Sequence, residues 1–139
     1  FKKYENLKEL NNNLIHSLCI SALKKKKIII KNGSVQRTFI PSQIFIQVLN
    51  SIIKKNFFKN SIINISYKNF TLRDIANVIQ KRSKIIFNLT IDTVIKKFSH
   101  KKKIVIYKNK NFKFNHINKQ FYFEIEQILK NIKKMIKKI

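Results

Sequence analysis

The chain has 139 residues, of which 31 are Lys or Arg and 6 are Asp or Glu, so its formal net charge is +25. Hydrophobic residues make up 44% of the sequence, which is enough to bury a core and argues against a disordered chain. The few acids, the scattered histidines and a single glycine provide no paired carboxylates, no metal-ligand cluster and no glycine-rich phosphate loop, so we expect no enzyme activity, no catalytic or metal-binding residues and no cofactor.

The first half of the chain alternates between helical periodicity and the short apolar runs that are typical of strands. Leucines recur at three- and four-residue steps from Leu7 to Leu18, and Asn32-Gly33 between two apolar runs predicts a β-hairpin. Pro41-Ser42 stands where a strand would give way to a helix. The elements expected here are a helix over residues 7–22, strands over 28–30 and 35–40, a helix over 44–53 and a strand over 57–68.

The second half contains one clear helix start, several apolar runs and a basic helix. Thr71 followed by Asp74 has the spacing of a capping box, which predicts a helix that ends near Lys81-Arg82. In the last segment isoleucines recur on one side and lysines on the other, which predicts an amphipathic helix. The elements expected here are a helix over residues 72–82, strands over 85–91, 93–98 and 104–107, an irregular segment over 108–118 and a helix over 125–139.

This order of elements predicts an α+β fold. We expect an N-terminal helix–β–helix–β module, then a small, mostly-β C-terminal module, and then a terminal basic helix. The predicted divisions are an N-terminal α/β module over residues 1–70, an inserted helix over 71–83, a C-terminal β module over 84–122 and an amphipathic basic helix over 123–139.

The large positive excess indicates a polyanionic partner, since a small folded chain with this charge would otherwise repel itself. Nucleic acid is the usual partner, because each neutralised phosphate releases condensed counterions. Part of the lysine content has another origin. Lys, Ile and Asn make up more than half of the chain, as in proteins encoded by organelle genomes or by very A/T-rich nuclear genomes. The single Cys19 fits a reducing compartment, and no apolar run approaches the roughly 20 residues of a membrane span.

Two stretches of the sequence resemble the eighth small-subunit ribosomal protein family. Between Leu14 and Phe58, a first helix, a strand, a Pro-Ser helix start and a Lys-Lys-x-Phe-Phe exit follow one another in the family's order. Downstream, Ile95 to Ser99 matches the family's Leu-Lys-Arg-Ile-Ser, and Tyr107 ends a strand in both. The family's Ser-Thr-Ser-Lys-Gly motif has no counterpart in this sequence.

The resemblance directs the phosphate contacts towards RNA. The densest basic run, Lys96 to Lys103, is the first candidate, whereas Lys24 to Lys27 could equally serve the negative end of the first helix. The hydroxyl of Ser42 could be a helix cap. The aromatic rings of Tyr107, Phe112 and Phe114 could stack on a base or belong to the core. The candidate RNA-binding residues are Lys24, Lys25, Lys26, Lys27, Ser42, Lys54, Lys55, Lys96, Lys97, Ser99, His100, Lys101, Lys102, Lys103, Tyr107 and Lys108.

The resemblance implies a structural, rRNA-binding constituent of the small ribosomal subunit of an organelle, expected to be the mitochondrion, with the plastid as the alternative. The implied partners are the central domain of the small-subunit rRNA and neighbouring small-subunit proteins, with no small-molecule substrate. A different class of protein stays open: a basic membrane-associated or nucleic-acid-compacting accessory protein that acts through its final amphipathic helix.

Overall fold

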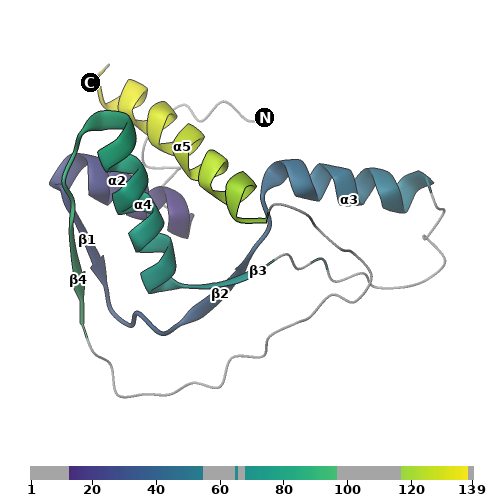
Figure 1. The fold of residues 1–139 in the computed structure, drawn as a ribbon, viewed down its shortest axis with the longest axis horizontal. Helices are drawn as coiled ribbons and strands as arrows, with labels where there is room; N and C mark the ends of the chain where they lie inside the picture. The colour runs from purple at the N-terminus through teal and green to yellow at the C-terminus, as the bar shows by residue number, and fades with distance from the viewer. Residues whose placement is uncertain (1–12, 55–64, 66–67, 97–116, 138–139) are drawn as a thin grey trace.

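The computed structural model describes residues 13–54, 65, 68–96 and 117–137. Within these residues the chain is a mixed α+β fold of four helices and two two-stranded sheets, which confirms the predicted fold class (Figure 1). The elements in chain order are α2 (Leu14–Lys25), β1 (Lys27–Ile30), β2 (Gln36–Phe39), α3 (Ser42–Lys54), β3 (Lys68–Thr71), α4 (Leu72–Phe87), β4 (Asp92–Ile95) and α5 (Ile117–Ile136).

The two strands of the predicted hairpin exist, but they do not pair with each other. β1 pairs in parallel with β4, with Lys27 opposite Asp92, and β2 pairs antiparallel with β3. The Asn32 side chain accepts hydrogen bonds from the backbone N–H and the hydroxyl of Ser34, at 3.1 and 2.8 Å. Gly33 has no positive φ, which a two-residue hairpin turn of this type requires. The hairpin prediction is therefore wrong, and Asn32-Gly33 forms a corner between two sheets.

The capping box predicted at the start of α4 is confirmed. The Thr71 hydroxyl accepts the backbone N–H of Asp74 at 3.0 Å, and the Asp74 carboxylate accepts the backbone N–H of Thr71 at 3.1 Å. The helix continues to Phe87, so its predicted end near residue 82 and the predicted strand over 85–91 are wrong. No residue interrupts the helix before Asn88, which adopts φ 49° and closes the last turn through its N–H to the Lys84 carbonyl.

The remaining expectations fall partly outside the described residues. The predicted strand over 93–98 is present as β4 only up to Ile95, and its last two residues lie outside the described residues. The predicted final helix is present as α5. α5 begins at Ile117, so the expected irregular segment over 108–118 is wrong at its last two residues. The strand expected at 104–107 and most of the one expected at 57–68 lie outside the described residues.

α2, α4 and α5 pack against one another and share one core, to which β1 adds Ile28 and Ile30. Phe70 of β3 stacks on Phe121 of α5, with ring centroids 4.2 Å apart, which attaches the second sheet to the same core. Burial raises the pKa of the Cys19 thiol, which here acts as a small apolar side chain. The buried residues of this core are Leu18, Cys19, Ile20, Ala22, Ile28, Ile30, Phe70, Ile75, Ala76, Ile79, Ile91, Phe121, Ile125, Leu129 and Ile132.

α3 lies apart from the other three helices and projects away from them (Figure 1). Its buried residues Ile44, Val48 and Ile52 form a separate small cluster with Ile40 and Ile65. The described residues therefore form a helical body around one core, from which α3 projects.

Candidate nucleic-acid interface

The C-terminal ends of α2, α4 and α5 meet at one end of the molecule (Figure 1). β1 follows α2, and β4 follows α4; because the two strands are parallel and in register, both helices end beside the strand starts. The Nζ atom of Lys133 in α5 lies 3.8 Å from the ring centroid of Phe87, the last residue of α4. Three helix C-termini therefore share one region of the surface.

Each of these helix ends carries lysines. We call this region the basic pole and define it by Lys24, Lys25, Lys26, Lys27, Lys84, Lys133, Lys134 and Lys137. All are exposed except Lys133, which is half-buried over Phe87. A helix C-terminus carries about half a negative elementary charge, so three of them offset only a small part of this positive charge. Among the described residues at this end, Asp92 is the single carboxylate.

The other described carboxylates are engaged in structural contacts. Asp74 forms the capping box of α4. Glu126 forms an ion pair with Arg82, with 3.0 Å between the Glu126 Oε1 and Arg82 Nη1 atoms. Glu124 accepts hydrogen bonds from Ser42. Within the part of the chain that the structure describes, the carboxylates therefore do little to offset the lysines of the basic pole.

A row of lysines on α5 leads into the basic pole. We call it the lysine stripe: Lys119, Lys130, Lys134 and Lys137, all exposed. Helical geometry places these residues on one face of α5, opposite the buried Ile125 and Leu129. Phe123 lies on the same face and is 58% exposed.

The predicted basic RNA-binding residues that the structure describes fall into three separate places. Lys24 to Lys27 belong to the basic pole. Lys96 is exposed just beyond the opposite end of the β1–β4 ladder, where its backbone N–H donates to the Ile30 carbonyl at 2.8 Å. Four-residue strands separate the two by about 13 Å. Lys54 ends the projecting α3. The structure therefore does not bring these candidates into one site.

Nine further candidate RNA-binding residues cannot be assigned to any of these places, because the structure does not describe them. The candidates outside the described residues are Lys55, Lys97, Ser99, His100, Lys101, Lys102, Lys103, Tyr107 and Lys108, together with the possible stacking residues Phe112 and Phe114.

Ser42 is held by a residue 82 positions away in the sequence. Its hydroxyl donates to the Glu124 carboxylate at 2.7 Å, and its backbone N–H lies 3.2 and 3.3 Å from the two carboxylate oxygens. Glu124 of α5 thus accepts the free backbone N–H at the N-terminus of α3. The sequence predicted that the Ser42 hydroxyl itself would cap this helix.

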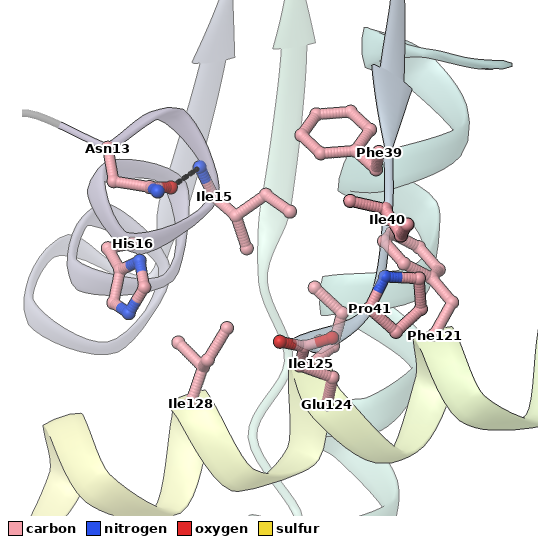
Figure 2. A pocket seen from close by; sticks show the side chains of 10 residues that line it. All are labelled: Asn13, Ile15, His16, Phe39, Ile40, Pro41, Phe121, Glu124, Ile125 and Ile128. Carbon is pink, nitrogen blue, oxygen red and sulfur yellow. Dashed lines mark hydrogen bonds between the residues drawn. The ribbon is translucent and has the colours of Figure 1, made fainter. Parts of the chain in front are cut away.

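A cavity of about 130 Å³ lies beside Glu124. Figure 2 shows the side chains that line it. Burial lowers the pKa of His16 in its wall, and the Glu124 carboxylate partly opposes that shift. The cavity is smaller than those that enclose cofactors. Within the described residues no group of three or more His, Cys, Asp or Glu could hold a metal ion. The lining residues are Asn13, Ile15, His16, Phe39, Ile40, Pro41, Phe121, Glu124, Ile125 and Ile128.

Sequence reasoning missed Lys84, Lys119 and Phe123. Lys84 was assigned next to a strand, and the start of α5 was expected several residues too late. Extending the helical period of α5 upstream from Lys130 would have placed Phe123 and Lys119 on the lysine face.

Comparison of the chain with models of known protein families, with curated proteins and with solved structures gives no match. The fold and surface define a basic α+β protein with a lysine-rich pole. The ribosomal resemblance therefore depends on the motifs of the sequence alone.

Proposed function

We propose that this protein binds RNA through the basic pole and is a structural constituent of the small ribosomal subunit of an organelle. The observation that carries the RNA-binding part is the meeting of three lysine-bearing helix ends, with Asp92 as the one carboxylate among the described residues there. Lysine ammonium groups at such a surface would contact phosphates as point charges and follow the shape of an RNA helix, without reading its sequence.

The ribosomal and organellar parts of the proposal rest on the sequence. The family resemblance suggests the central domain of small-subunit rRNA and neighbouring small-subunit proteins as partners. The A/T-rich codon signature is compatible with an organelle, for which we propose the mitochondrion, with the plastid as the alternative. The modules expected over residues 1–70, 71–83, 84–122 and 123–139 belong to this proposal as well. The shared core of α2, α4 and α5 would then join these modules.

The packing of α5 favours RNA over a membrane as the partner. A helix that lies in a membrane surface buries its apolar face among lipid chains. In α5 that face is already buried against the protein, since Ile125, Leu129 and Ile132 are at most 1% exposed. Membrane insertion would require α5 to leave the core. Among the described helices, none is long and apolar enough to cross a membrane.

The RNA-binding part is tested by titrating the protein with a fragment of small-subunit rRNA at several salt concentrations. Replacing Lys25, Lys27, Lys134 and Lys137 with Gln should lower the affinity and reduce the slope of log K against log salt by about 3. The matched control replaces four exposed cations away from the pole, Lys31, Arg37, Lys68 and Arg73, with Gln and should change the slope less. Equal effects of the two variants would contradict a defined interface.

The ribosomal part is tested by sedimentation of the native organelle contents through sucrose. The chain should travel with the small-subunit rRNA after membranes are removed, and this peak should disappear after RNase treatment. A peak away from the rRNA would overturn the ribosomal proposal, even if the purified protein binds RNA.

A further inference from the structure

We propose that Phe123 of α5 stacks on an unpaired RNA base, so that the lysine stripe holds a single-stranded segment of RNA. This inference rests on the proposed RNA-binding function and adds the kind of RNA and the residue that recognises it. Phe123 is the most exposed aromatic side chain among the described residues, at 58%. The other described aromatic side chains of the helical body are buried or half-buried.

The position of Phe123 on α5 aligns it with the lysines. Lys119 precedes it by four residues and Lys130 follows it by seven, which places all three on one face of the helix, about 6 and 10 Å apart along the axis. The stripe from Lys119 to Lys137 is about 27 Å long. An RNA strand that follows this face would have cations on both sides of one exposed aromatic ring.

The charges around the stripe are compatible with phosphate. The nearest carboxylate on this side of α5 is Glu126, which is paired with Arg82 at 3.0 Å. The Arg82 guanidinium also lies over the ring of Tyr122, 4.9 Å from its centroid. Glu126 is therefore already neutralised within the protein, and the stripe keeps its positive character.

A nucleotide base fits this site better than an apolar protein surface. The side chains next to Phe123 along the exposed face are Lys119, Glu126 and Gln127, with Lys130 one turn further on. All are polar, so that an apolar partner would meet one ring among charged and polar groups. A base offers a flat π surface on a negatively charged backbone, which matches an aromatic ring between lysines. Phe45 on α3 is the contrasting case, because Ile46 and Leu49 are exposed beside it and α3 has no lysine before Lys54.

The sequence contains no Trp, so a single substitution provides a specific optical probe. In Phe123→Trp, titration with single-stranded poly(U) should quench the new indole fluorescence, because a stacked base quenches it. Titration with a blunt RNA duplex should leave it largely unchanged. Phe45→Trp is the matched control and should respond to neither RNA.

Affinity provides the second readout, measured on variants whose circular dichroism matches that of the unchanged protein. Phe123→Ala should weaken poly(U) binding by about 5- to 150-fold and leave duplex binding unchanged, whereas Phe123→Tyr should retain both. If Phe123→Ala binds poly(U) as well as the unchanged protein does, while the basic-pole variant binds RNA poorly, stacking is refuted and the RNA-binding function stands. If the unchanged protein binds neither RNA, the proposed function itself fails.

Discussion

α3 and α5 are both amphipathic helices, but they use their apolar faces in different ways. The apolar face of α5 is buried against α2 and α4, and its other face carries the lysine stripe. α3 buries only Ile44, Val48 and Ile52, and its single charged residue is Lys54. Its exposed apolar side chains are Phe45, Ile46, Leu49 and Ile53.

The comparison shows that α5 combines burial in the main core with a row of exposed lysines, whereas α3 does neither. α5 closes the core and presents cations, so its sequence serves both purposes. Among the described residues, Ser42 at the start of α3 is hydrogen-bonded to Glu124 of the body. We therefore expect substitutions in α5 to affect the whole fold and substitutions on the exposed side of α3 to have small effects.

The largest difference between the two helices should appear on truncation of a leucine in each. Leu129 is fully buried, so Leu129→Ala should lower the free energy of unfolding by about 2–5 kcal/mol through lost burial and a new cavity. Leu49 is 37% exposed, and Leu49→Ala should change it by no more than about 0.5 kcal/mol. Urea unfolding followed by circular dichroism measures both. Similar losses would mean that α3 belongs to the same cooperative core as α5.

A smaller effect is expected where the two helices meet. Glu124→Gln removes the charge that accepts the hydrogen bonds of Ser42, and should cost about 1–2 kcal/mol of unfolding free energy. Glu126→Gln is the control, since it weakens only a partly exposed ion pair and should cost less than about 1 kcal/mol. Ser42→Ala combined with Glu124→Gln should cost less than the sum of the single changes. Additive costs would show that the contact does not join α3 to α5.

The cap of α4 gives a reference for a helix start that is stabilised locally. Thr71→Ala removes the hydroxyl that accepts the Asp74 N–H, and should lower the unfolding free energy by about 1 kcal/mol. Thr90→Ala, at an exposed position after α4, should have almost no effect. Both values come from the same urea experiment. A Thr71→Ala cost as small as that of Thr90→Ala would contradict the capping box.

The mildest expected effect is a pH dependence that arises at His16. Burial lowers the folded-state pKa of His16 below its ordinary value of 6.5, so the unfolded state binds the proton more tightly. The free energy of unfolding should therefore decrease as the pH falls from 7.5 to below 6.5, until the pH passes the lowered pKa. Because the Glu124 carboxylate partly opposes the shift, Glu124→Gln should steepen this decrease.

Urea unfolding at pH 7.5, 6.5 and 5.5 measures that dependence. His16→Asn should flatten it, because the titrating group is removed. A protein that gains stability as the pH falls over this range, and loses that gain in His16→Asn, would show the opposite sign of the pKa shift.

Local signals predicted the helices of this fold well. Thr71 and Asp74 define a start through side-chain and backbone hydrogen bonds only three residues apart, which a sequence displays directly. Isoleucines at helical spacing likewise predicted α5. Ile85 and Ile86 led to the wrong prediction of a strand over 85–91, because β-branched residues favour strands. Such residues do not end a helix, and α4 ends only at Asn88, its C-cap.

Local signals could not predict which strands pair. They also could not predict which basic residues lie close together on the surface. β1 pairs with β4, more than 60 residues later, and nothing in the run Ile28 to Ile30 distinguishes that partner from β2. Lys24 to Lys27 were identified as a charged run, but their proximity to Lys84 and Lys133 depends on that parallel pairing. Phe123 is apolar in an apolar-rich sequence, so only its orientation on α5 separates it from the core.

The shared core also determines when this chain can fold during its synthesis. Leu18 and Ile28 emerge early from the ribosome, whereas Leu129 and Ile132, which complete the same core, are added about 100 residues later. The core therefore cannot close until residue 132 has emerged, and the earlier apolar segments stay uncovered until then. Throughout that interval the nascent chain lacks its complete core and already carries many of its cations. Its lysines could therefore contact RNA electrostatically before the folded basic pole is formed. Under the proposed function, RNA binding would then begin before folding is complete.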